Sequence, residues 1–328
     1  MQHTIEELKQ MQALPLSVKI AMSKSRIREW VREFGEDGVY ISFSGGKDST
    51  VLLDIAREEY PGLKAVFLDS GLEFPEIREF VKNFENVDWI KPDLTFKQAI
   101  QKYGYPFFSK EVSNIVYYAR QHLRQGRTDT AVLKKMSKDN NSRYSVKRYN
   151  FMLQAPFEIN SRCCNIFKKN PSHKYERRTG RHKITGQLAC ESQLRTQKWL
   201  TNGCNAFDIE YPCSNPLSFW TEQDVLKYIY EKNLPIASIY GKVAKEMSQP
   251  DLFGNADEIF KTTGVDRTGC VFCGFGLHLD KEPNRLQKLK TSHPNLYEYI
   301  MKPTSEGGLG YKEIIDWINK NGCFKIKY

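Results

Sequence analysis

The chain has 328 residues, a formal net charge of +10, and hydrophobic residues at 40% of its positions. This length suffices for one large or two smaller domains with a substantial core. No run approaches the roughly 20 apolar residues that a membrane-spanning helix requires, and the first residues lack the features of a secretory signal, so we expect a cytoplasmic protein.

The N-terminal part is predicted to be helical over residues 4–34, with an interruption at Pro15. Thr4 and Glu7 have the spacing of a capping box, in which each side chain bonds the other residue's backbone. A short apolar run from Val39 to Phe43, rich in β-branched and aromatic residues, then predicts a buried strand.

A glycine-rich turn follows this strand and precedes a helix predicted over Thr50 to Glu59. Two glycines allow the backbone to approach a ligand, and free N–H groups at a helix start favour an anion. Lys47 adds a positive charge, so the turn is suited to phosphate. The spacing is not that of a Walker A loop, and a plain glycine turn is the alternative.

The sequence of this turn, Ser-Gly-Gly-Lys-Asp-Ser, resembles the pyrophosphate loop of the PP-loop ATPases, ATP sulfurylases and phosphoadenosine phosphosulfate (PAPS) reductases. The resemblance implies that an adenine nucleotide, ATP with Mg²⁺, is bound here by its phosphates. Asp48 would lie near the metal ion, and Lys47 and Asp48 would be catalytic. The implied phosphate-binding residues are Ser44, Gly45, Gly46, Lys47, Asp48 and Ser49.

Strands and helices continue to alternate after this loop. Strands are predicted from Leu63 to Leu68 and from Val87 to Ile90, and helices begin at Pro75 and Thr95. Such alternation predicts an α/β fold with an open, mostly parallel sheet and helices on both faces. The resemblance adds that this fold is of the adenine nucleotide alpha hydrolase type. Sheets of this kind bind ligands at the carboxyl ends of their strands.

The segment from Phe67 to Glu76 resembles the PAPS reductase pattern Asp-Thr-Gly followed by Phe-Pro-Glu. In that family this pattern flanks the nucleotide, whereas the alternative is a plain turn at the end of a strand. The resemblance implies three further nucleotide-binding residues, Asp69, Ser70 and Gly71.

Residues 97–150 are strongly basic, with twelve basic and three acidic side chains and six interleaved tyrosines. Basic side chains bind phosphates and aromatic rings stack on unpaired bases, so a nucleic acid (tRNA or DNA) is one interpretation. A solvated helical face with core tyrosines is the other. We expect a basic helical insert at about 104–160. The basic residues are Lys97, Lys102, Lys110, Arg120, Arg124, Arg127, Lys134, Lys135, Lys138, Arg143, Lys147 and Arg148.

Four of the eight cysteines stand in two tight pairs, Cys163-Cys164 and Cys270-x-x-Cys273. In a cytosolic chain, cysteines indicate metal ligands or catalytic thiols more than disulfides. Four thiolates can hold zinc or an iron–sulfur cluster. Adjacent cysteines point in divergent directions, which favours the cluster.

The two pairs, with a lysine after the first, resemble those of the iron–sulfur sulfonucleotide reductases. The resemblance implies a catalytic Lys168 and a [4Fe–4S] cluster, with zinc and unrelated buried cysteines as alternatives. Its implied ligands are Cys163, Cys164, Cys270 and Cys273.

The resemblance continues between the cysteine pairs. A strand and turn ending at Gly186 are similar to the family's Thr-Gly segment, and Arg195 to its phosphate- or sulfate-binding arginine. A surface arginine is the alternative for Arg195. Residues 215–225 resemble the Pro-Leu, Trp-Thr, Asp-Val segment of these enzymes, in which Thr221 caps a helix over 222–232. We interpret this segment as scaffold.

Two departures from the family bear on function. Sulfonucleotide reductases end in a Glu-Cys-Gly-x-His tail whose cysteine attacks sulfur, whereas this chain has only Cys323 near its end. Their phosphate loop is usually degraded, whereas this one is intact, as in enzymes that cleave ATP. The predicted divisions are N-terminal helices over 1–36, a PP-loop α/β domain over 37–240, and a cluster-completing region over 241–328.

The leading hypothesis is an enzyme that binds ATP–Mg²⁺, adenylates an acceptor and transfers sulfur through its cluster, with a nucleic acid as one acceptor. It would require a sulfur or electron donor protein. The second hypothesis is an adenylylsulfate or PAPS reductase with Cys323 as nucleophile. The third is a noncatalytic nucleic-acid-binding or sensor protein, and fold-level analogy alone does not choose among them.

Overall fold

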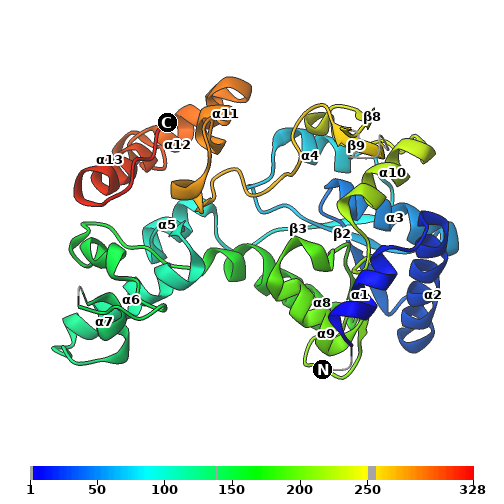
Figure 1. Ribbon diagram of the computed structural model, residues 1–328, viewed down its shortest axis with the longest axis horizontal. Coiled ribbons are helices and arrows are strands. Elements are labelled where there is room, and N and C mark those ends of the chain that lie inside the picture. Colours follow the sequence, from blue (N-terminus) through cyan, green and yellow to red (C-terminus); the bar gives the residue numbers. More distant parts are fainter. Residues whose placement is uncertain (1–2, 138, 250–255) are drawn as a thin grey trace. The chain divides into compact units, whose positions relative to one another are not determined.

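The computed structural model describes residues 3–137, 139–249 and 256–328, and Figure 1 traces the chain. The chain divides into two compact units, each built from two separate stretches of sequence. The first unit contains residues 1–92 and 168–269, and the second contains residues 93–167 and 270–328.

A six-stranded sheet forms the centre of the first unit, in the order β3-β2-β1-β5-β7-β6. Its strands pair in parallel, except that β6 runs antiparallel to β7. This mostly parallel sheet, flanked by helices (Figure 1), confirms the predicted α/β fold class. The strands are β1 (Val39–Ser42), β2 (Ala65–Leu68), β3 (Val87–Ile90), β5 (His182–Ile184), β6 (Asn205–Ala206) and β7 (Cys213–Ser214).

The central strands are buried, as expected where helices cover a parallel sheet. In β1, Val39, Tyr40 and Ile41 are at most 2% exposed. Helix α2 contributes Ile27 and Trp30, both fully buried, to the same core. The helices of this unit are α1 (Ile5–Gln12), α2 (Leu16–Phe34), α3 (Lys47–Glu59), α4 (Pro75–Val81), α8 (Asn170–Thr179), α9 (Gln193–Asn202) and α10 (Glu222–Lys232), with 3₁₀ turns η3 (Ala189–Glu191) and η4 (Ser238–Tyr240).

The helix starts agree with the capping residues read from the sequence. Thr4 and Glu7 form the predicted capping box, and Pro15 stands at the break between α1 and α2. Thr221 caps α10 as predicted. Helix α3, however, begins at Lys47 instead of Thr50. The last three residues of the glycine-rich turn therefore form the first turn of this helix.

A two-stranded antiparallel ribbon, β8 (Val243–Met247) with β9 (Glu258–Thr262), follows α10. This ribbon could not be predicted from the sequence, because its strands are polar and lack a clear alternation of apolar and polar residues. Opposite charges pair across the ribbon instead, with Lys245 to Glu258 at 2.5 Å and Lys261 to Glu246 at 2.8 Å. Such cross-strand pairs favour an exposed ribbon.

The second unit is mainly helical and joins the 93–167 stretch to the C-terminal stretch. Strand β4 pairs in parallel with β10, and Tyr105 donates a hydrogen bond to the carbonyl of Leu309 at 2.9 Å. No helix among the described residues is long and apolar enough to cross a membrane. The elements are α5 (Phe96–Tyr103), β4 (Phe107–Phe108), α6 (Lys110–Arg124), α7 (Ala131–Met136), η1 (Lys147–Gln154), β10 (Gly274–Phe275), η5 (Leu277–Leu279), α11 (Arg285–Ser292), α12 (Pro294–Met301), η6 (Thr304–Glu306) and α13 (Tyr311–Asn321); the π-helical turn η2 (Asn165–Lys169) spans the point where the chain passes between the units.

Candidate functional site

The strand order of the first unit reverses at β1. Strands β2 and β3 lie on one side of β1, and β5, β7 and β6 lie on the other. In open α/β sheets ligands bind outside the carboxyl ends of the strands at such a switch point. The turn over residues 44–49, here called the phosphate loop, follows β1, and Gly186 lies just beyond the end of β5. The fold therefore brings these two predicted segments to one place.

Two glycines allow the close approach of backbone segments at this place. A Cβ on Gly186 would lie 2.9 Å from the carbonyl oxygen of Asp48, so a side chain would not fit there. Gly45 has φ +70°, and its Cβ would lie 2.7 Å from Val81 and 2.8 Å from Ile77. Glycine relieves both constraints.

The hydroxyl groups of the phosphate loop hold its shape. Ser49 donates to the carbonyl of Gly46 at 2.9 Å and lies 3.0 Å from the hydroxyl of Ser44. Ser49 is 5% exposed, whereas Ser44 is exposed. Ser49 thus supports the loop from within, and Ser44 faces solvent.

Lys47 is a nearly buried cation, with its side chain 3% exposed. Its Nζ lies 3.1 Å from Oε1 of Glu222 and 3.7 Å from Oδ2 of Asp48. Glu222 is the first residue of α10. The sequence analysis misses it, because an acidic residue after an N-cap is already explained by the helix dipole.

One carboxylate oxygen of Asp48 lacks a hydrogen-bond partner among the described residues. This atom, Oδ1, is buried. Burial raises the pKa of Asp48, and the charge of Lys47 offsets part of that rise. A buried carboxylate oxygen of this kind is suited to a cation.

Two arginines complete a connected set of charges. Arg195, in the first turn of α9, forms an ion pair with Glu191. Arg267 lies 3.7 Å from Glu191 and 3.7 Å from Glu222. We call these residues the charge cluster: Lys47, Asp48, Glu191, Arg195, Glu222 and Arg267.

The structure therefore places Arg195 in the same network as the phosphate loop. Burial lowers the pKa of Arg195, and the charge of Asp48 acts against that effect. Arg267 is not among the predicted site residues, although it stands three positions before Cys270. The nearby cysteines indicate metal binding, and no residue close to Arg267 in the sequence indicates that it lies beside Glu222 of α10.

The turn after β2 is held by bonds of its own. Asp69, 5% exposed, accepts a hydrogen bond from Arg78 at 2.9 Å. The hydroxyl of Ser70 donates to Glu73 at 2.5 Å, and Gly71 has φ +72°. These residues form a rigid strand-end turn in the first unit.

The second unit contains both cysteine pairs. The pKa of Cys163 is raised by its hydrogen bond with Cys164, then by burial, and further by the nearby thiols of Cys273 and Cys270. All four thiols are partly buried. The thiols of the second pair therefore lie near enough to Cys163 to affect its charge state.

The donor set suits an iron–sulfur cluster or zinc, since both are held by cysteine thiolates. No group of three or more His, Cys, Asp or Glu side chains stands ready to hold a metal ion within residues 3–137, 139–249 and 256–328. The four thiols fit such a group by their chemistry, but the described residues do not form a finished ligand array.

Two side chains that the sequence analysis misses brace residues 270–275, here called the cysteine loop. Arg285 donates to the carbonyls of Cys273 at 3.2 Å and Phe275 at 3.0 Å. Tyr311 donates to the carbonyl of Phe272. Both come from helices of the C-terminal stretch, which sequence spacing alone does not connect to the loop.

Two predicted catalytic residues remain, Lys168 and Cys323. Lys168 is exposed and lies in the π-helical turn shortly after the first cysteine pair. Cys323 is an exposed thiol beyond α13, in the second unit. The phosphate loop belongs to the first unit.

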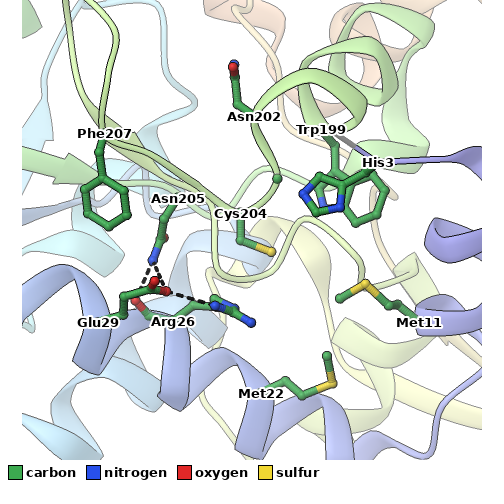
Figure 2. Close-up of a pocket in the computed structure, with 11 residues that line it drawn as sticks. His3, Met11, Met22, Arg26, Glu29, Trp199, Asn202, Cys204, Asn205 and Phe207 are labelled. Atoms are coloured by element: carbon green, nitrogen blue, oxygen red, sulfur yellow. Dashed lines mark hydrogen bonds and ion pairs between the residues drawn. The ribbon is translucent and has the colours of Figure 1, made fainter. Parts of the chain in front are cut away.

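The first unit also has a pocket of about 410 Å³ that the sequence analysis does not predict (Figure 2). Among its lining residues, Trp199 contacts His3, and Glu29 accepts hydrogen bonds from Arg26 and Asn205. Its lining includes none of the predicted site residues. The other lining residues are Met11, Met22, Asn202, Gly203, Cys204 and Phe207.

Comparison with known proteins gives consistent matches. Residues 38–274 match the family model described as phosphoadenosine phosphosulfate reductase domain. An adenosine 5'-phosphosulfate reductase from Staphylococcus epidermidis is 22% identical over 268 residues, which cover 78% of this chain and 87% of that protein. An uncharacterised protein from Methanocaldococcus jannaschii is 23% identical over 274 residues, covering 84% of this chain and 49% of that one. A phosphoadenylyl-sulfate reductase structure from Candida auris, a phosphate complex, aligns with a TM-score of 0.39 and 15% identity, covering 73% of this chain and 91% of that one.

Proposed function

Since the chain belongs to the phosphoadenosine phosphosulfate reductase domain family and is an enzyme, we propose that it binds ATP at the phosphate loop and catalyses nucleotide-activated sulfur transfer. The observation that carries this proposal is a buried cation beside a carboxylate that has one buried oxygen with no hydrogen-bond partner among the described residues. Lys47 supplies the cation and Asp48 the oxygen. Together they suit a phosphate chain with its Mg²⁺ ion.

The chain's own residues account for the activation step. An oxygen atom of the acceptor attacks the α-phosphorus of ATP, and the bond to pyrophosphate breaks. Lys47 and Arg195 neutralise the charge that grows on the departing pyrophosphate. A sulfide sulfur then attacks the acceptor atom that carries the adenylated oxygen. A bond from that atom to sulfur forms, its bond to the oxygen breaks, and AMP leaves with the oxygen.

The four paired cysteines would hold an iron–sulfur cluster, which supplies sulfur or electrons when bound. In the protein itself, Arg285 and Tyr311 fix the backbone of the cysteine loop. The thiols of the second pair are thereby oriented before any group binds. Fixed backbone around metal-binding cysteines supports ligand geometry.

A nucleic acid is the acceptor that the basic region supports best. Tyr118 and Tyr144 are 51% and 61% exposed, and the guanidinium of Arg143 lies 4.7 Å from the ring centre of Tyr144. Part of the positive charge is structural, since Arg120 donates to the carbonyl of Phe157 at 2.6 Å. The exposed basic side chains include Lys110, Arg127, Lys134, Lys135, Arg143, Lys147 and Arg148; Lys138 lies outside the described residues.

A sulfonucleotide reductase is the second candidate, favoured by relatives that include adenosine 5'-phosphosulfate reductases. A thiolate would attack the sulfur of adenylylsulfate, the S–O bond would break, and AMP would leave. An external thiol would then reduce the enzyme thiosulfonate and release sulfite. Cys323 is the exposed thiol nearest the C-terminus.

One anaerobic experiment separates the candidates. Protein is incubated with ATP, a sulfide source and RNA or DNA, and in parallel with adenylylsulfate and a thiol reductant. Release of pyrophosphate that depends on nucleic acid supports sulfur transfer. Release of sulfite without pyrophosphate supports the reductase, and neither product from any substrate contradicts both.

A further inference from the structure

Arg267 is the cation of the charge cluster with the greatest freedom to move. Its side chain is 52% exposed, whereas that of Lys47 is 3% exposed. Its guanidinium lies 3.7 Å from Glu191 and 3.7 Å from Glu222. These distances exceed those of direct N–H···O hydrogen bonds. The guanidinium therefore rests loosely between two carboxylates.

The chain on both sides of Arg267 is nevertheless tied to Tyr240, through the backbone of Gly264 and the side chain of Thr268. The N–H of Gly264 donates to the carbonyl of Tyr240 at 2.9 Å, and the hydroxyls of Tyr240 and Thr268 lie 2.6 Å apart. The Tyr240 hydroxyl would lie 3.3 Å from a Cβ on Gly46. Only the Arg267 side chain has to move to meet a ligand at the loop.

Glu222 is shared between two cations. Its Oε1 lies 3.1 Å from Lys47, and its Oε2 lies 3.7 Å from Arg267. Carboxylate and phosphate oxygens accept hydrogen bonds from the same ammonium and guanidinium donors. An anion entering the loop therefore competes with Glu222 for both cations.

We propose that Arg267 binds the pyrophosphate portion of the nucleotide together with Lys47, and that Glu222 holds both cations until that anion enters. The inference rests on the proposed function, because it takes the phosphate loop to bind a nucleotide. A guanidinium offers two parallel N–H donors to a phosphate. Arg267 thereby makes the site selective for ATP over AMP.

The test is isothermal titration of the full-length protein with inorganic pyrophosphate, ATP and AMP in the presence of Mg²⁺. Arg267→Gln is expected to weaken pyrophosphate and ATP binding by about 10- to 100-fold, the loss of one charge-assisted bidentate contact. AMP binding should change by less than about twofold, within the effect of a surface substitution. Arg267→Lys keeps the positive charge but loses the paired N–H donors of the guanidinium. Its affinity for pyrophosphate and ATP should lie between those of the wild type and Arg267→Gln. Lys261→Gln on β9, whose side chain is 57% exposed and paired with Glu246, is the matched control and should bind like wild type.

Glu222→Gln provides a second test of opposite sign. It removes the competing charge from Lys47 and Arg267, so pyrophosphate should bind several-fold more tightly. A merely structural Glu222 would give weaker binding on substitution. The inference is overturned if Arg267→Gln binds pyrophosphate like wild type, if it loses AMP equally, or if Glu222→Gln binds more weakly. Wild-type protein that binds neither ATP nor pyrophosphate would overturn the proposed function as well.

Discussion

Lys47 and Asp48 are neighbours in sequence, yet the charged group of Lys47 is more fully paired than that of Asp48. The ammonium of Lys47 meets carboxylates of Glu222 and Asp48, whereas one oxygen of Asp48 meets none among the described residues. An unmatched buried carboxylate destabilises the fold at the pH where it is ionised. A bound cation would remove that penalty. The site therefore lowers the stability of the free protein in exchange for the ability to bind a ligand.

This compromise predicts the pH dependence of stability. Because the pKa of Asp48 is raised in the folded state, the folded protein holds that proton more tightly, and stability falls as pH rises through the window above the unfolded-state value. Asp48→Asn should therefore be more stable than wild type at pH 7, with the difference shrinking as pH falls. Thermal unfolding at several pH values measures this. A less stable Asn variant at pH 7 would contradict the assignment.

Lys47 and Cys323 separate the two enzyme hypotheses. Lys47→Ala should lower nucleotide turnover by about 10²- to 10³-fold, because a preorganised cation near the departing pyrophosphate is lost. Cys323→Ser should keep most of the activity, since the sequence around that thiol lacks the glutamate and histidine of the reductase tail. Pyrophosphate release measures both variants. A sulfonate trapped on Cys323 with adenylylsulfate would reverse this order.

At the scale of elements, local signals in the sequence identify strands and helix starts well. The strand Val87–Ile90 has the predicted bounds, and Thr95 and Thr221 cap the predicted helices. The predicted start of α3 at Thr50 is three residues too late. Small and polar residues are common both in glycine-rich loops and in the first turn of a helix, so the sequence does not distinguish the two. Glu222 and Arg267 could not be predicted, because their partners are set by packing between distant segments.

The α7 helix and the following turn allow a test of the basic region. If they bind a nucleic acid, each neutralised phosphate releases a counterion, so affinity falls with salt. The double variant Lys134→Glu, Lys135→Glu should reduce the slope of log affinity against log salt by about 2 and leave ATP binding unchanged. Fluorescence anisotropy with a labelled RNA measures the slope. If the wild-type protein does not bind RNA at low salt, the basic region is a solvated helical face and not a nucleic-acid-binding surface.

The cysteine loop gives a prediction that does not depend on activity. Protein purified without oxygen should contain about four iron and four sulfide per chain, and Cys163→Ser and Cys273→Ser should lose them. Cys204→Ser and Cys213→Ser should retain them, because Cys204 belongs to the hydrophobic core of the first unit and Cys213 lies in its sheet. Iron and sulfide analysis with visible absorbance measures the outcome. Stoichiometric zinc without iron would contradict the cluster.

At the scale of the whole molecule, the open sheet and its ligand edge follow from the alternation of strands and helices, but the division into units does not. The contacts that define the second unit join residues far apart in sequence, such as Tyr105 with Leu309 and Lys97 with Gly307. Local patterns carry no information about such pairings. The predicted boundaries near residues 36 and 240 remain a prediction.

The interleaving of the two units has a consequence during synthesis. The chain emerges from the ribosome N-terminus first, so the stretch 93–167 appears before the stretch 270–328 that completes its unit. Tyr105 must wait about two hundred residues for Leu309, which is at least about ten seconds at ordinary translation rates. Its apolar neighbours, including Phe107 and Phe108, which are at most 1% exposed in the finished protein, remain uncovered by their partners for that time. Nascent chains stalled before residue 270 should therefore engage chaperones that chains released at full length do not.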